Sequence, residues 1–250
     1  MTNASNERNL ESIDSAMTPE LEADHDGTLK IRELIGRELE IPRTKKARTT
    51  KQGLLDAGAK IFALKGYEQT RVADITELAA VAHGSFYRYF SDKDAILQEL
   101  LLELYKELGA ATQGDETRNR SSNPLKQLES FNIRFFHEYA KRRGLLRVAR
   151  EAAASTNEGC FRDIWFAMRG RFVTRTHRYI DKLQSRGLAT GLDAHLTAEA
   201  LGAMSEQMAY VLIGLAQELP SDEQLTAIGK TCNTVWTRTL FPEALSDDKA

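Results

Sequence analysis

The stretch from Thr70 to Phe90, TRVADITELAAVAHGSFYRYF, decides the fold that we expect for this chain of 250 residues. Val72, Ile75 and Leu78 follow helical spacing, and a break of about three or four residues separates them from a second short helix. Such a pair is typical of a helix-turn-helix, in which the second helix enters the DNA major groove. Two packed helices with a polar outer face are the alternative that the spacing leaves open.

The two faces of the second short helix differ in chemistry. Phe86 and Phe90 share one face at the i, i+4 spacing and are expected to anchor the helix in a core. The opposite face carries side chains that can hydrogen-bond phosphates or base edges. These side chains are His83, Ser85, Tyr87, Arg88 and Tyr89.

A longer helix is predicted before this pair, from about Thr50 to Lys65, and Gly66 is expected to end it in a left-handed conformation. Its apolar stripe consists of Leu54, Ala57, Gly58, Ile61 and Phe62. A glycine inside such a stripe costs about 1 kcal/mol of helix propensity. We therefore expect another helix to cross closely at Gly58.

Charge is sorted along the chain, although the whole chain has a formal charge of only -2. Residues 1–42 hold 10 acidic and 4 basic side chains, whereas residues 43–60 hold 6 basic and 1 acidic. The protein is therefore no general polycation, and any surface for nucleic acid must be local. The local basic block consists of Arg43, Lys45, Lys46, Arg48 and Lys51. A solvated charge run is the alternative interpretation of this block.

These motifs together resemble the amino-terminal DNA-binding domain of TetR-family transcriptional regulators. The resemblance rests on LLDAGAKIFALKGY at 54–67, TRVADI at 70–75, GSFYRYF at 84–90 and DKDAIL at 92–97. Ala80 stands where the family usually has the turn glycine, and Ala82 where it usually has a capping serine. A left-handed alanine costs about 1–2 kcal/mol and a missing cap about 1 kcal/mol. We therefore expect a reshaped or looser turn.

The resemblance also implies which residues contact DNA. Those expected on phosphates are Thr70, Tyr87, Tyr89 and Lys93, and those expected to read bases are His83, Gly84, Ser85 and Arg88. Arginine can bond guanine at two atoms, and Gly84 lets the backbone approach the groove. Arg48 could reach the adjacent groove as part of a flexible arm. Since one such domain makes few base contacts, we expect a homodimer on a palindromic or near-palindromic operator.

The predicted fold is all-α, with an amino-terminal three-helix DNA-binding domain containing the helix-turn-helix and a larger helical ligand-binding and dimerisation domain. We assign residues 43–97 to the first domain, 98–245 to the second and 246–250 to a tail. Residues 1–42 form an acidic, largely disordered extension. An apolar face over residues 28–40 could form a short helix that docks onto the body or folds back as an acidic screen over the basic block.

Further helices are expected along the second domain, where the apolar spacing stays helical. Their predicted ranges are 91–108, 124–142, 144–154, 157–186, 194–218 and 221–240, with a polar loop at 109–123. Ser91 and Asp94 have the spacing of a capping box at the start of the first of these helices. That helix would act as the lever between the two domains.

Aromatic side chains are concentrated in the second domain, where core packing is the default explanation for each. Several of them nevertheless indicate an apolar pocket for a small apolar or amphipathic effector. The candidate ligand-binding residues are Phe135, Tyr139, Trp165, Met168, Phe172, His177 and Tyr210. In the family that the chain resembles, this domain binds a small molecule and then releases DNA.

The last two predicted helices have broad apolar faces, which suit a two-fold dimer interface. The residues of these faces are Leu196, Ala200, Ala203, Met204, Met208, Val211, Leu212, Leu215, Leu225, Ile228, Cys232, Val235 and Trp236. An internal helical hairpin is the alternative.

Catalytic, metal and membrane signatures are not found in the sequence. The two cysteines and five histidines have no metal-ligand spacing, and no nucleophile elbow or glycine-rich nucleotide loop occurs. We therefore expect no cofactor, no metal and no enzyme activity, and a cytoplasmic protein without a membrane span. The alternatives are a helical enzyme that uses the aromatic pocket and a module whose short helix pair binds another protein.

Overall fold

The computed structural model describes residues 42–113, 124–155 and 160–242, whose regular secondary structure is helical, with no strand. The helices are α3 (Lys45–Gln69), α4 (Val72–Leu78), α5 (His83–Phe86), α6 (Lys93–Gln113), α7 (Pro124–Lys141), α8 (Arg143–Ser155), α9 (Cys160–Gln184), α10 (Ala194–Ala209), η2 (Tyr210–Gly214) and α11 (Asp222–Leu240). The all-α prediction is confirmed. In this described part, no helix is both long and apolar enough to cross a membrane. The predicted extension at residues 1–42 lies outside the described residues, apart from Pro42, as does the tail.

The helices group into two compact units. Of the described residues, 42–109, 142–155 and 160–168 form one, which we call the head unit. The others, 110–113, 124–141 and 169–242, form the body unit. The head unit thus includes α8 and the first turns of α9 in addition to α3, α4, α5 and most of α6.

The core of the head unit forms where α6 crosses α3. A Cβ atom added to Gly58 would lie 2.9 Å from Cδ1 of Ile96, so only a glycine allows this distance without a shift. The close crossing expected at Gly58 is therefore confirmed. Leu54, Phe62 and Ile96 are completely buried at this contact between helices.

Helix α3 begins earlier than the apolar pattern predicts. Thr44 caps it, because its side-chain oxygen accepts a hydrogen bond from the backbone N–H of Ala47 at 3.2 Å. Gly66 has a positive φ of 76° and a ψ of 176°, which lie outside the helical region, so the regular helix is interrupted there as predicted, and one further turn leads to Gln69. The predicted start at Thr50 is wrong, because the apolar stripe begins only after the first turns.

The start of α6 corrects a second prediction. Asp92, not Ser91, caps this helix, since its Oδ1 accepts a hydrogen bond from the backbone N–H of Ala95 at 2.8 Å. Ser91 donates to the other oxygen of Asp92 at 2.8 Å. Asp94 is used differently, because it accepts a hydrogen bond from the hydroxyl of Tyr67 at 2.8 Å. Desolvation, followed by this bond to a carboxylate, raises the pKa of Tyr67.

Helix α8 packs on α3 within the head unit. A Cβ atom on Gly144 would approach Cβ of Ala63 to 2.5 Å, so the two helices are nearly in contact through their backbones. The Nη2 of Arg147 donates to the carbonyl oxygen of Ala63 at 2.6 Å. This hydrogen bond joins α8 to the carboxyl-terminal half of α3.

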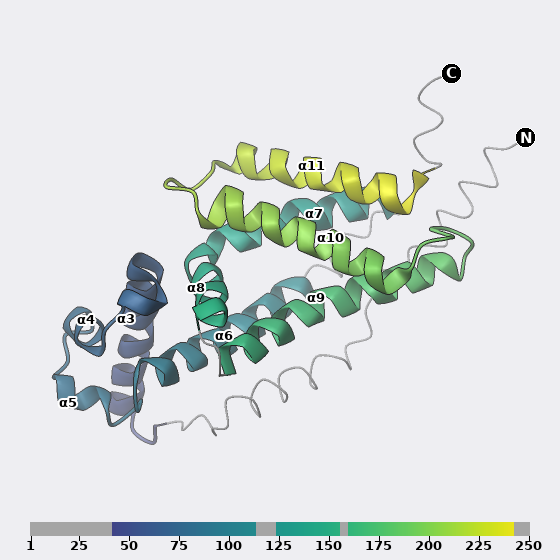
Figure 1. The fold of residues 1–250 in the computed structure, drawn as a ribbon. Helices are drawn as coiled ribbons and strands as arrows, with labels where there is room; N and C mark the ends of the chain where they lie inside the picture. The colour runs from purple at the N-terminus through teal and green to yellow at the C-terminus, as the bar shows by residue number, and fades with distance from the viewer. Residues whose placement is uncertain (1–41, 114–123, 156–159, 243–250) are drawn as a thin grey trace, which may run out of the picture. The chain divides into compact units, whose positions relative to one another are not determined.

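In the body unit, α7 and α11 lie side by side (Figure 1). A Cβ atom on Gly229 would lie 2.5 Å from Cα of Ile133, which makes this one of the closest helix contacts in the described part. Trp236 is buried, and its indole N–H donates to the hydroxyl of Ser205 on α10 at 3.2 Å. Asn132 on α7 donates a hydrogen bond to Asn233 on α11 at 3.1 Å, which also joins these two helices.

The helix predicted at 194–218 ends differently, because α10 stops at Ala209 and a π-helical turn follows.

The apolar face predicted for the last two helices is only partly exposed. Leu225, Cys232 and Trp236 are buried in the body unit and cannot form an outer face. Those that remain exposed are Leu196, Ala200, Ala203, Val211, Leu212, Leu215 and Val235. The prediction of one continuous interface was therefore wrong for the inner residues.

Candidate DNA-binding interface

The turn between α4 and α5 keeps a left-handed residue without a glycine. Ala80 has φ of 54°, and the next residue, Val81, donates its N–H to the carbonyl oxygen of Thr76 at 3.0 Å. Ala82 occupies the N-cap of α5 and makes no side-chain capping bond. The chain therefore adopts the compact turn even though both residues are unfavourable there.

The α4 end of the motif is fixed by polar contacts. Asp74 accepts a hydrogen bond from the backbone N–H of Arg71 at 3.1 Å and forms an ion pair with Lys65 at 2.8 Å. The hydrogen bond from Lys65 is the main reason why the pKa of Asp74 is lowered. This contact ties the first turn of α4 to α3, which lies beside it (Figure 1).

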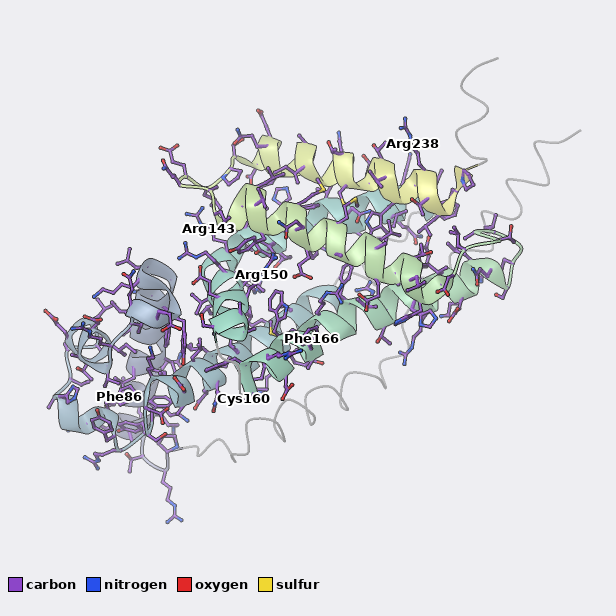
Figure 2. The ribbon with its side chains drawn as sticks, in the orientation of Figure 1. Phe86, Arg143, Arg150, Cys160, Phe166 and Arg238 are labelled. Atoms are coloured by element: carbon purple, nitrogen blue, oxygen red, sulfur yellow. The ribbon has the colours of Figure 1, made fainter. Side chains whose placement is uncertain are left out.

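Phe86 and Phe90 anchor α5 as predicted. Phe86 is 0% exposed and Phe90 3%, and their ring centroids lie 5.6 Å apart. Figure 2 labels Phe86 on α5, which lies against α4. The helix is short, because regular geometry ends at Phe86 and residues 87–89 form a turn. The helix is therefore shorter than predicted, because the i, i+4 spacing of Phe86 and Phe90 implied a helix that continues to Phe90.

The opposite face of α5 and its turn is open to solvent. His83, Gly84, Tyr87 and Arg88 are exposed, and Ser85 and Tyr89 are half-buried. Tyr87 is 54% exposed, and its hydroxyl lies 3.4 Å from Nε2 of His83. A Cβ atom on Gly84 would meet nothing within 4 Å, so the protein itself does not require a glycine there. Four of the six predicted residues are therefore open to solvent, and the other two are partly covered.

Thr70 is placed differently from the prediction. Its side chain is 2% exposed, and its hydroxyl donates to the carbonyl oxygen of Gly66 at 2.6 Å. A buried hydroxyl with a protein acceptor has no surface to offer a phosphate. Thr70 thus caps the end of α3, and this burial argues against its predicted contact with a phosphate.

Lys93 lies at the start of α6 with its ammonium group turned to the end of α3. Nζ donates to the carbonyl oxygen of Tyr67 at 3.0 Å and to that of Glu68 at 3.4 Å. It also lies 4.3 Å from the ring centroid of Tyr67. Because the side chain is only half-buried, a phosphate could still share the ammonium group.

Arg48 is exposed, but it belongs to a helix and not to a flexible arm. It lies in the first turns of α3, and its Nη1 donates to the carbonyl oxygens of Pro42 and Arg43 at 3.2 and 3.1 Å.

Lys51 does not belong to the exposed basic block. It is buried and forms an ion pair with Glu99 at 2.8 Å. Sequence reasoning missed this pair, because the two residues are far apart in the chain.

The candidate ligand residues divide between the two units. In the body unit, the Phe135 ring lies 5.6 Å from Phe172 and 6.4 Å from Tyr139. Tyr210 forms the first residue of the π-helical turn, next to Gly214. Trp165 and Met168 belong to the head unit.

His177 has different neighbours from the aromatic candidates. Its ring contacts His195 at 5.6 Å, and its Nε2 lies 3.5 Å from a carboxylate oxygen of Asp181. Sequence reasoning also missed Phe131, whose ring stacks on Phe172 at 6.2 Å and lies under the guanidinium group of Arg175 at 4.8 Å. Its position four residues before Phe135 on the same helix was the available signal.

A left-handed turn, an anchored short helix and an exposed polar face define a helix-turn-helix DNA-binding protein. Two protein-family models match the chain. Bacterial regulatory proteins of the tetR family match residues 54–100, and the C-terminal domain of the transcriptional regulator EthR matches residues 130–242.

Individual relatives agree with these models. The transcriptional repressor DhaR of Mycobacterium sp. (strain GP1) is 34% identical over 86 residues, which is 34% of this chain and 43% of DhaR. This chain thus matches less than half of the length of DhaR. The regulator EthR of Mycobacterium tuberculosis (strain H37Rv) is 25% identical over 174 residues, which is 69% of this chain and 78% of EthR.

Solved structures share the fold. A regulatory protein in the tetR family from Rhodococcus RHA1 has a TM-score of 0.62 at 20% identity, covering 79% of this chain and 98% of that chain. FadR of Bacillus subtilis, solved in complex with stearoyl-CoA, has a TM-score of 0.59 at 19% identity, covering 76% and 98%. The chain belongs to the TetR family and is a DNA-binding transcriptional regulator.

Proposed function

We propose that this chain is a repressor that binds a palindromic or near-palindromic operator as a homodimer. A small apolar or amphipathic effector releases it from the DNA. On the operator, His83, Gly84, Ser85 and Arg88 read bases. The residues that hold phosphates are Tyr87, Tyr89 and Lys93, with Arg48 on the adjacent backbone.

The exposed face of α5 is the observation that carries the DNA-binding part of this proposal. Phe86 is fully buried while its neighbour Tyr87 is more than half exposed, so the helix is fixed on one side and free on the other. Exposed Arg88 offers a planar donor group that can bond O6 and N7 of guanine together. Such a fixed polar surface suits direct base reading.

An operator selected from random duplex DNA tests this assignment in a fluorescence anisotropy titration. We expect Arg88→Ala to lower operator affinity about tenfold or more and to relax the preference at one base position. Arg178→Ala is the matched control, because Arg178 is an exposed arginine of the body unit. Equal operator affinity for the Arg88 variant and the control would refute the placement.

The exposed apolar stripe of the body unit supports the homodimer. Leu196, Val211, Leu212, Leu215 and Val235 are each between 42% and 64% exposed, on α10, the following turns and α11. Exposed large apolar side chains are typical of interfaces. Leu212→Asp should shift the protein toward monomer in sedimentation velocity, whereas Leu64→Asp, at an exposed leucine of the head unit, should not. If the Leu212 and Leu64 variants were both monomeric, or both dimeric, the result would contradict this interface.

The aromatic cluster of the body unit supports an apolar or amphipathic effector. Phe131, Phe135 and Phe172 are only half-buried, although the Phe172 ring lies 6.2 Å from that of Phe131 and 5.6 Å from that of Phe135. The structure of the fold neighbour FadR contains stearoyl-CoA, which is one probe to use. We expect a ligand of this class to release operator DNA from the wild-type protein. It should release a smaller fraction of the DNA from the Phe172→Ala variant. Phe166→Ala, at an exposed ring of the head unit, is the control. Operator release that is equal in both variants would refute the cluster as the effector site.

A further inference from the structure

The start of α3 concentrates positive charge on the surface. Arg43, Lys45, Lys46 and Arg48 are exposed, whereas the first turn of the helix contains no acidic residue. Cations at this end lie at the positive pole of the helix dipole, where anions are favoured instead. The four like charges also repel one another. An anionic partner for this surface would remove both penalties.

The chain before α3 carries the opposite charge in an uneven way. Residues 1–26 hold 7 acidic and 1 basic side chain, and residues 27–41 hold 3 of each. The negative charge is therefore concentrated in the part that is farther from α3 along the chain. The 15 residues from 27 to 41 connect the two. They span about 23 Å as a helix and about 50 Å when extended, so residues 1–26 can reach the start of α3.

We propose that the acidic segment, residues 1–26, binds the exposed cations at the start of α3 and competes there with DNA phosphates. This inference rests on the DNA-binding function proposed above. Tethering gives the segment an effective concentration in the millimolar range, which compensates for the weakness of single exposed ion pairs. The segment acts as an intramolecular competitor and lowers the affinity of the protein for duplex DNA.

Full-length protein tests the proposal through a variant in which all seven carboxylates of residues 1–26 are replaced by amides. With a duplex of arbitrary sequence in about 0.1 M salt, we expect the variant to bind on the order of tenfold more tightly, as the loss of a few exposed ion pairs predicts. The plot of log affinity against log salt should be steeper by about 0.9 for each cation set free.

A double-mutant cycle shows whether the contact is local. In a Lys45→Gln and Lys46→Gln background, the gain from removing the carboxylates should fall to about twofold or less. An equal gain in both backgrounds would mean that the segment acts by general repulsion of DNA, and it would overturn the proposal. No gain in the wild-type background would overturn it as well.

Zero-length carbodiimide crosslinking tests the contact without DNA. We expect amide links from Lys45 or Lys46 to carboxylates of residues 1–26, detected by mass spectrometry and lost when excess duplex is added. Lys230, an exposed lysine of α11, is the control and should not form them. Links to Lys230 alone would overturn the proposal. If the links form but neither protein binds DNA, the contact stands and the proposed DNA-binding function is refuted.

Discussion

The left-handed turn predicts that glycine substitutions at two neighbouring alanines change the stability of the protein in opposite directions. Ala80 has φ of 54°, whereas Ala79 has φ of -75° and ψ of -7°. Glycine adopts the first conformation without strain, but it weakens the second, which is helical. We therefore expect Ala80→Gly to stabilise the protein and Ala79→Gly to destabilise it.

The size of the effect at Ala80 follows from two opposing contributions. Relief of the left-handed strain of an alanine contributes about 1–2 kcal/mol. The greater entropy of a glycine in the unfolded chain offsets about 0.4–1 kcal/mol of this gain. The net stabilisation is about 0.5–1 kcal/mol, which corresponds to a rise of about 1–4 °C in Tm for a chain of this size.

Thermal unfolding followed by circular dichroism measures the change, and hydrogen exchange of the Val81 amide reports on the turn itself, since this amide donates to Thr76. Ala189→Gly is a second test, because Ala189 has φ of 51° in the body unit. If Ala80→Gly lowered the Tm as much as Ala79→Gly, the left-handed geometry of the turn would be refuted.

Other substitutions test separate contacts. Gly84→Ala should leave the Tm nearly unchanged, since an added Cβ meets nothing within 4 Å, but lower operator affinity about tenfold in anisotropy titrations. Gly229→Ala should cost about 1–3 kcal/mol in urea unfolding because its Cβ meets the backbone of Ile133. Gly58→Ala should be nearly neutral, because only a mobile side-chain end yields and about 1 kcal/mol of helix propensity is gained. The pKa of Asp74 is lowered from 3.8, so its stabilising contribution exists at neutral pH and is lost as the pH falls through the lowered value. Asp74→Asn should thus lower the Tm more at pH 7 than at pH 2, and an equal loss at both values would contradict this assignment.

Helical periodicity made much of the fold predictable. It gave the all-α class, the helix pair at residues 70–90 and the approximate ranges of α7, α8, α9 and α11. It worked because these helices bury one apolar face, and the spacing of that face is written in the sequence. The start of α3 has no such face. Its cap, Thr44, was visible as a threonine before a helix-forming run, but the apolar pattern alone pointed to Thr50.

Pairings between distant residues could not be predicted from one sequence. Lys51 looked like one more cation of a basic block, yet its partner Glu99 lies on α6 and removes it from the surface. Similarly, an apolar face predicts burial without specifying the partner. Trp236 and Val235 are adjacent on α11, but the first packs inside the body unit and the second is exposed. The candidate interface therefore needed the three-dimensional structure.

The helix-turn-helix keeps its geometry through packing and not through its turn residues. The strain at Ala80 and the missing cap at Ala82 together oppose the motif by about 2–3 kcal/mol. Burial of Phe86 and Phe90 contributes about 1.5–3 kcal/mol for each ring, which exceeds that cost. Because the two rings hold α5 from its inner side, the outer residues are free to serve DNA recognition. The sequence could thus lose the favoured turn residues without losing the recognition surface.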